Sequence, residues 1–373
     1  MKKRWIAMLL TGCLLFGLTG CGGKDESPEQ PPEEEKQEEI VPPPVEEVPE
    51  VEPEPEPEPV EPVPGGINPL TGLPMEEAYE NNRPIAVMFN NLKAAQPQLG
   101  VSQADIIYEI PAEGGITRMV GLFQTMEGVQ NLGSIRSTRT YYLEVALGHD
   151  AVLLHAGGSP DAYNKIASWD VDNIDGVRGG HGEEKVFWRD AERKKSAGYE
   201  HSLLTCGENV LEYLAKGRYT TQHADGYSYP ITFVEEGTPA NGNPANKVRL
   251  VFSQYKTGLF EYDAETDLYM VSQYGGDYVD GNSGEQVGVT NLLVLETDIN
   301  TIAGDKEGRL TVDLDGEGKG TYFCGGKSVP ITWSKADRNS PFVYRCNGAP
   351  LALEAGVSYI CIMDPGQSVL SVE

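Results

Sequence analysis

Short apolar runs separated by turn residues dominate the chain from about residue 66 onward. In the first half of this region, runs typical of buried strands alternate with stretches in which apolar residues recur at helical spacing. Such alternation favours an α/β-type arrangement. We expect strands over 84–90, 105–110, 116–123 and 151–155, and helices over 141–147, 160–169 and 206–216.

After residue 225 the pattern changes to short β-type runs with Gly, Asp and Asn turns between them. Regularly spaced short runs of this kind are typical of antiparallel sheets. We therefore predict an α+β protein. An α/β-type N-terminal domain is expected over 67–227, followed by a mostly antiparallel β C-terminal domain over 228–373.

The first residues follow a different pattern. Lys2, Lys3 and Arg4 precede a short apolar stretch, which ends in the segment Leu18-Thr19-Gly20-Cys21. A basic start and a short apolar stretch are typical of a secretory signal peptide, and the final four residues resemble the lipobox of bacterial lipoproteins. We predict a lipoprotein signal peptide over 1–20 and a lipid on Cys21, which anchors the chain at the extracytoplasmic face of the cell membrane. An ordinary secretory signal with a chance cysteine is the alternative.

Glu and Pro dominate the segment that follows the predicted signal peptide. Proline restricts the backbone and like charges repel, so we expect a disordered acidic tether over 21–66. The whole chain holds 57 Asp and Glu residues against 29 Lys and Arg residues, a formal net charge of -28. This balance argues against general binding to nucleic acid or to an anionic membrane surface, because both require a basic face.

Four cysteines lie beyond the predicted tether: Cys206, Cys324, Cys346 and Cys361. Outside the cell, a Cys324–Cys346 or Cys346–Cys361 disulfide is possible, and free buried thiols are equally compatible with the sequence. The histidines and cysteines do not follow the spacing of common metal sites. We therefore expect neither a metal nor a cofactor.

Several motifs occur in an order that is seen in a known family. They are Asn68-Pro69-Leu70-Thr71-Gly72, Glu113-Gly114-Gly115-Ile116-Thr117-Arg118, Ile135-Arg136-Ser137-Thr138-Arg139 and His155-Ala156-Gly157-Gly158-Ser159-Pro160. With these motifs, nearly all of 67–373 resembles the YerB-like lipoprotein family of Gram-positive bacteria. The resemblance implies a two-domain envelope lipoprotein and brings no established biochemical activity.

The clearest candidate for a binding site combines arginines with a glycine-rich turn. Arg118, Arg136 and Arg139 carry guanidinium groups, which suit phosphate or carboxylate. Free backbone N–H groups at the start of a helix also favour an anion, and the sequence predicts such a start at the segment Gly157-Gly158-Ser159. Simple helix capping and structural salt bridges from the arginines to Glu109 and Glu113 are the alternatives.

His155 ends an apolar run, at a position where α/β folds often carry function. One hypothesis makes it a general acid or base, with Glu109 or Glu113 as its carboxylate partner. The alternative is a core histidine with satisfied hydrogen bonds. Two functions therefore remain open: a lipoprotein that binds an anionic cell-wall ligand, and a hydrolase or transferase that acts on an envelope glycan or phosphodiester.

Overall fold

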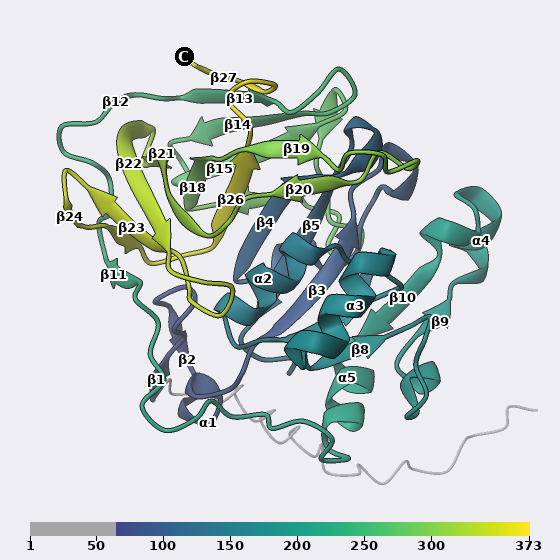
Figure 1. Cartoon of the computed structure of the whole chain (residues 1–373). Helices are drawn as coiled ribbons and strands as arrows, with labels where there is room; N and C mark the ends of the chain where they lie inside the picture. The colour runs from purple at the N-terminus through teal and green to yellow at the C-terminus, as the bar shows by residue number, and fades with distance from the viewer. Residues whose placement is uncertain (1–64) are drawn as a thin grey trace, which may run out of the picture. The chain divides into compact units, whose positions relative to one another are not determined.

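The computed structural model describes residues 65–373, and its largest sheet runs through both halves of the sequence (Figure 1). The strand order is β24-β23-β22-β21-β18-β26-β4-β5-β3-β7-β8, and β12 pairs with β22 at the side. The strands are β3 (Ile85–Asn90), β4 (Ile106–Pro111), β5 (Thr117–Phe123), β7 (Val152–His155), β8 (Asn173–Asp175), β12 (Asn243–Pro244), β18 (Asn291–Glu296), β21 (Gly316–Cys324), β22 (Lys327–Lys335), β23 (Val343–Cys346), β24 (Ala349–Pro350) and β26 (Ser358–Met363).

The central strands are apolar along their whole length because both faces of the sheet are covered. On β3, Ile85, Val87 and Phe89 belong to one hydrophobic core, whereas Ala86 and Met88 belong to a second core. This alternation follows from the two-residue period of a strand.

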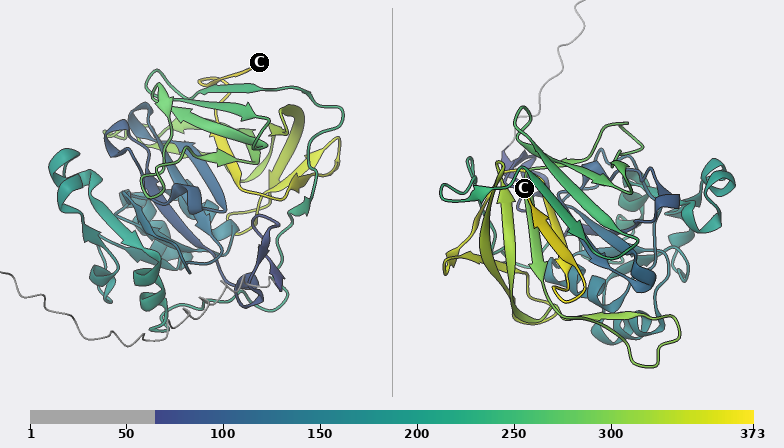
Figure 2. Two further views of the ribbon diagram at one scale, coloured as in Figure 1. Left: turned by 180° about the vertical axis from the view of Figure 1, so that it is seen from behind. Right: turned by 90° about the horizontal axis from the view of Figure 1, so that it is seen from above.

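The helices α2 (Thr140–Gly148) and α3 (Pro160–Trp169) cover one face of the main sheet, and a second sheet and α5 (Gly207–Leu214) contribute to the core on the other (Figure 2). The second sheet has the order β16-β15-β14-β13-β27, and β17 pairs with β15. Its inner residues, among them Val248 and Leu250, are buried beside Leu292 of the main sheet. The strands are β13 (Lys247–Val251), β14 (Thr257–Asp263), β15 (Leu268–Gln273), β16 (Gly276–Asp277), β17 (Gly288–Val289) and β27 (Val369–Val372).

Smaller elements complete the fold. The α-helices are α1 (Glu77–Glu80), α2 (Thr140–Gly148), α3 (Pro160–Trp169), α4 (Ala191–Ser196) and α5 (Gly207–Leu214). The remaining strands are β1 (Gly66–Ile67) with β2 (Pro74–Met75), β6 (Asn131–Gly133) with β9 (Trp188–Arg189) and β10 (Leu203–Cys206), β11 (Thr232–Val234) with β25 (Ala352–Glu354), and β19 (Ile299–Thr301) with β20 (Leu310–Val312). Mostly antiparallel strands with few helices confirm the predicted α+β class.

A strand from near the C-terminus lies in the middle of the main sheet. β26 pairs in parallel with β4 on one side and with β18 on the other. Ile360 is opposite both Tyr108 and Leu293. The expected N-terminal and C-terminal domains therefore share one continuous sheet, and a domain boundary near residue 228 stays a prediction.

The cysteines beyond the tether are all free thiols, and Cys324 and Cys361 are buried. Neither of the two disulfides that we considered is formed. Between residues 65 and 373, the helices are too short or too polar to cross a membrane. The predicted signal peptide, Cys21 and nearly all of the tether lie outside the described residues.

Candidate functional site

Residues 134–139 cross the carboxyl ends of β3 and β7. The backbone N–H of Arg136 donates to Met88 O (2.9 Å), and the N–H of Ala156 donates to Arg136 O (3.0 Å). Thr138 N–H in turn donates to Gly157 O (2.9 Å). The predicted arginine motif and the glycine-rich turn therefore meet at the carboxyl edge of parallel strands, where α/β folds commonly bind ligands.

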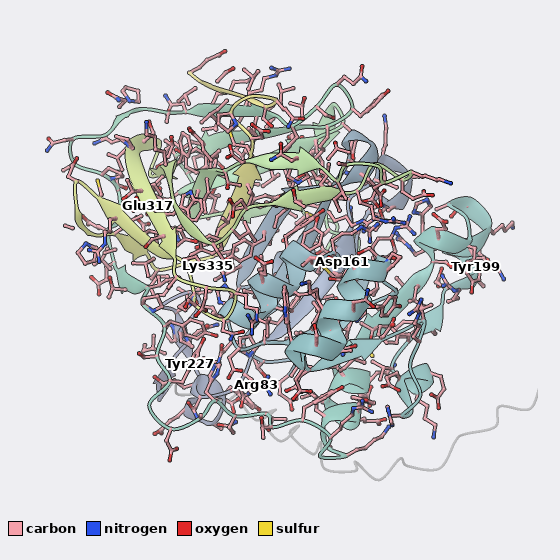
Figure 3. All side chains as sticks on the ribbon, viewed as in Figure 1. Arg83, Asp161, Tyr199, Tyr227, Glu317 and Lys335 are labelled. Atoms are coloured by element: carbon pink, nitrogen blue, oxygen red, sulfur yellow. The ribbon has the colours of Figure 1, made fainter. Side chains whose placement is uncertain are left out.

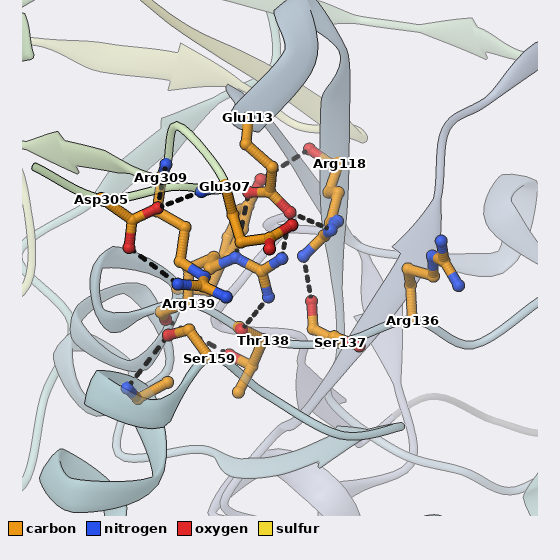
Figure 4. Close-up of polar contacts among 12 residues, drawn as sticks. Glu113, Arg118, Arg136, Ser137, Thr138, Arg139, Ser159, Asp305, Glu307 and Arg309 are labelled. Carbon is orange, nitrogen blue, oxygen red and sulfur yellow. Dashed lines mark hydrogen bonds and ion pairs between the residues drawn. The ribbon is translucent and has the colours of Figure 1, made fainter. Parts of the chain in front are cut away.

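Arg118 and Arg139 share a single carboxylate, that of Glu113 (Figure 4). Arg118 Nη2 donates to Glu113 Oε1 at 2.8 Å, and Arg139 Nε donates to Glu113 Oε2 at 3.0 Å. Arg139 Nη2 also donates to Glu113 Oε1. Both arginines are buried, and their Nη1 groups donate to the backbone carbonyls of Ser137 and Thr138 at 2.7 Å each.

The two arginines keep Glu113 ionised. Burial alone would raise the pKa of Glu113, but the hydrogen bond from Arg139 and the charges of Arg118 and Arg139 outweigh it and lower the pKa from 4.5 to about 2. Arg118 and Arg139 carry two positive charges and Glu113 carries one negative charge, so the three side chains together have a net charge of +1.

Glu113 therefore contributes to stability above its unfolded pKa of 4.5, and the contribution disappears as the pH falls through about 2. We expect Glu113→Gln to lower the free energy of unfolding by about 2 kcal/mol near neutral pH, because both guanidiniums lose a charged hydrogen-bond partner. Urea unfolding at about pH 6 and pH 3 should show a smaller difference from wild type at the lower pH. Glu317→Gln, at an exposed glutamate, is the control. If wild type and Glu113→Gln differ by the same free energy of unfolding at both pH values, Glu113 does not stabilise the fold through its charge.

Arg136 points away from Glu113 and has a different partner (Figure 4). Its Nη2 donates to Glu200 Oε2 at 2.9 Å, and the Glu200 side chain is 68% exposed. The hydrogen bond and the charge of Arg136 lower the pKa of Glu200, and Arg118 contributes to the same shift. Within the described residues, Nε of Arg136 and Nε of Arg118 are buried and have no hydrogen-bond partner. We call Arg118, Arg136, Arg139, Glu113 and Glu200 the arginine cluster.

The loop between β19 and β20 lies beside the arginine cluster, as Figure 4 shows for Asp305, Glu307 and Arg309. Arg309 Nη1 pairs with Asp305 Oδ2 at 2.7 Å. This loop belongs to the C-terminal half of the chain. Gly308 of this loop lines the same pocket as Gly114, the residue after Glu113, whereas Arg136 lies on the other side of Arg118 in Figure 4.

The glycine-rich turn starts α3 as predicted. Ser159 is the N-cap, and its Oγ accepts from Ala162 N (3.1 Å) ahead of Pro160. Gly157 has a positive φ of 79°, which favours glycine. Its N–H donates to Asp175 Oδ1 at 2.8 Å, and Gly158 lies opposite Thr138 in a β-bridge. These contacts place the turn next to the arginines, but an internal carboxylate already accepts from the Gly157 amide.

His155 is completely buried, and both of its ring nitrogens have partners. Nδ1 lies 2.8 Å from Gly157 O, and Nε2 lies 3.1 Å from Asn173 Oδ1. Within residues 65–373, the carboxylate that pairs with the ring is that of Asp175, at 3.9 Å, and is neither Glu109 nor Glu113. The expected pairing does not form because β5 and β3 separate β4, which carries Glu109, from β7.

Glu109 instead belongs to a buried polar network that the sequence analysis missed. Lys256 Nζ lies 3.0 Å from Glu109 Oε1, and each side chain is 1% exposed. The carboxylate also accepts from Asn91 (2.9 Å), Thr117 (2.5 Å) and Tyr359 (2.6 Å). No local sequence pattern around Lys256 indicates a partner 147 positions away.

Within the part of the chain that the structure describes, no group of three or more His, Cys, Asp or Glu side chains is arranged to hold a metal ion.

Two family models match the chain. The N-terminal domain of DUF3048, described as a protein of unknown function, matches residues 70–220, and its C-terminal domain matches residues 248–360.

Individual proteins show the same relationship. The Bacillus subtilis (strain 168) protein YerB, which its name classes as a candidate lipoprotein, is 30% identical over 275 residues, or 72% of this chain and 78% of YerB. The crystal structure of the Bacillus subtilis YerB protein matches with a TM-score of 0.71 and 28% identity, covering 82% of this chain and 99% of that chain. The chain therefore belongs to the YerB-like DUF3048 family.

Proposed function

We propose that this protein is a lipoprotein, anchored by a lipid on Cys21, that binds an anionic cell-envelope ligand at the arginine cluster. The similarity to YerB supports the lipoprotein assignment. The acidic segment between Cys21 and residue 66 would act as a tether. At about 3 Å per residue, a polyproline II chain of this length reaches up to roughly 130 Å.

The observation that carries the binding proposal is the place of Arg136 at the carboxyl edge of the sheet, next to Arg118 and Arg139 but directed away from Glu113 toward the exposed Glu200. Three arginines face two glutamates within the cluster, so one positive charge remains on a chain with a net charge of -28. The side chains of the Glu113 pairs are 5–19% exposed, whereas the Glu200 side chain in the pair with Arg136 is 68% exposed. An exposed pair is worth little, so an incoming phosphate or carboxylate can displace Glu200 from Arg136.

The geometry favours binding over catalysis by His155. A general acid or base needs a ring nitrogen within reach of the substrate. Both nitrogens of His155 are engaged by internal oxygens, and the ring has no exposed surface.

The proposal is tested by measuring the affinity of residues 65–373 for pyrophosphate and glycerol 3-phosphate by calorimetry. Arg136→Gln should weaken binding at least about tenfold, because it removes a charge-assisted hydrogen bond. Glu200→Gln should tighten binding about two- to fivefold, because it removes the competing exposed carboxylate. Arg345→Gln, at an exposed arginine of β23, is the control and should change nothing. Equal affinities for wild type and Arg136→Gln would refute the proposal.

A further inference from the structure

A separate pocket of about 590 Å³ lies between α1 and the segment that leads into β11. Figures 1 and 2 show this segment running beside β1 and α1. Aromatic residues line one side of the pocket, and Glu77 and Glu80 of α1 line the other. None of these residues belongs to the arginine cluster.

The aromatic side follows the alternation of an extended chain. Tyr227, Tyr229, Ile231 and Phe233 are half-buried and line the pocket, while the residues between them are exposed. Tyr227 stacks on His223 with ring centroids 3.9 Å apart and an angle of 9° between the planes. Tyr229 meets the Tyr227 ring edge-on at 5.2 Å. This packing holds the rings in fixed positions (Tyr227 is labelled in Figure 3).

His223 supplies a buried polar atom that lacks a partner. Its Nδ1 lies 2.8 Å from Asp150 Oδ2, and a carboxylate accepts, so Nδ1 carries the proton. With Nδ1 paired to Asp150, Nε2 is the second polar atom of the ring. His223 lines the pocket and is 6% exposed. Within the region from residue 65 onward, its Nε2 is buried and has no hydrogen-bond partner.

The polar groups of the pocket therefore call for a ligand that is positively charged and donates hydrogen bonds. Two carboxylates are acceptors, Nε2 of His223 lacks a partner, and the described lining contains neither Lys nor Arg. Aromatic rings attract organic cations through their π faces, and carboxylates strengthen this attraction. We infer that the pocket binds an organic ammonium group, with Glu77, Glu80 and the aromatic residues as its recognition elements.

The inference is tested by calorimetric titration of the full chain with choline and with ethanolamine, at matched ionic strength. The neutral isostere of choline, 3,3-dimethylbutan-1-ol, is the ligand control. We expect at least one ammonium compound to bind at least about tenfold more tightly than the isostere. The compound that binds shows whether the site prefers methylated ammonium or one with N–H donors.

Variants locate the binding. Glu77→Gln combined with Glu80→Gln should weaken ammonium binding at least about tenfold, since it removes both carboxylates and keeps their shape. Glu235→Gln combined with Glu236→Gln changes two exposed glutamates outside the lining and should have no effect. Arg136→Gln should leave ammonium binding intact, which separates this inference from the anion proposal. No ammonium binding, equal binding of the isostere, or equal binding by the Glu77 and Glu80 double variant would each overturn it.

Discussion

His149→Gln should lose less stability on acidification than wild type does. The free energy of unfolding of wild type minus that of the variant should fall by about 3 kcal/mol from about pH 7 to about pH 4. His149 is 2% exposed. Its Nε2 lies 2.9 Å from Tyr108 Oη, and its ring packs between Tyr108 and Tyr229. Burial, followed by the charges of Lys335 and His223, lowers the pKa of His149 from 6.5 to about 3.

The direction follows from proton uptake. Between pH 6.5 and about 3, the unfolded chain protonates His149 and the folded protein does not, so wild-type stability falls as the pH falls. Gln does not titrate, and its amide can still hydrogen-bond Tyr108. The partly buried carboxyls of Asp105 and Glu144 act in the opposite direction, because desolvation raises their pKa values to about 6 and about 7. Both carboxyls are present in wild type and variant, so their contribution cancels in the difference.

Urea unfolding of both proteins across this pH range provides the measurement. The exposed His181→Gln is the matched control and should give a nearly constant difference from wild type. A constant difference for His149→Gln as well would show that the folded protein protonates His149 as readily as the unfolded chain does.

Lys256→Met should lower the free energy of unfolding by about 3–5 kcal/mol, because it leaves the Glu109 carboxylate buried without its cation. Lys256 and Glu109 are each 1% exposed and lie 3.0 Å apart. Lys256 also contacts Gln273 through a hydrogen bond. The pair connects the turn between β13 and β14 to β4, so its loss weakens the packing between the two halves of the chain.

A second variant distinguishes the charge from the shape of the side chain. Adding Glu109→Gln to Lys256→Met removes the uncompensated charge and should recover part of the lost stability, so the double variant should cost less than the sum of the single variants. Lys247→Met is the control, because Lys247 and Glu261 are 42% and 51% exposed and such pairs contribute less than about 1 kcal/mol. Additive losses in urea unfolding would mean that Lys256 and Glu109 stabilise the fold independently.

Local elements could be predicted from the sequence because they depend on nearby residues. Apolar runs indicated β3, β5 and β7, and the Ser159-Pro160 cap indicated the start of α3. The place of β26 between β4 and β18 could not be predicted, because its apolar pattern fits any buried strand. Pairing across distant positions depends on the whole sheet.

The candidate site shows the same limit. Arg118, Arg136 and Arg139 were grouped because guanidinium groups suit an anion, with salt bridges to Glu109 and Glu113 as the alternative. In the structure, Arg118 and Arg139 pair with Glu113. Glu200, the partner of Arg136, was missed because it lies 64 positions away. The expected pairing of His155 with Glu109 or Glu113 was wrong, since strand order decides which side chains meet.

The position of β26 also makes the main sheet depend on a segment that lies far from β4 in the sequence. Ser358–Met363 form the strand that pairs with β4 on one side and with β18 on the other. As long as this segment is not inserted, β4 and β18 each keep a backbone edge without a partner, and such edges pair readily with strands of other chains. Insertion of β26 therefore closes both edges in one step and protects the folded chain against aggregation.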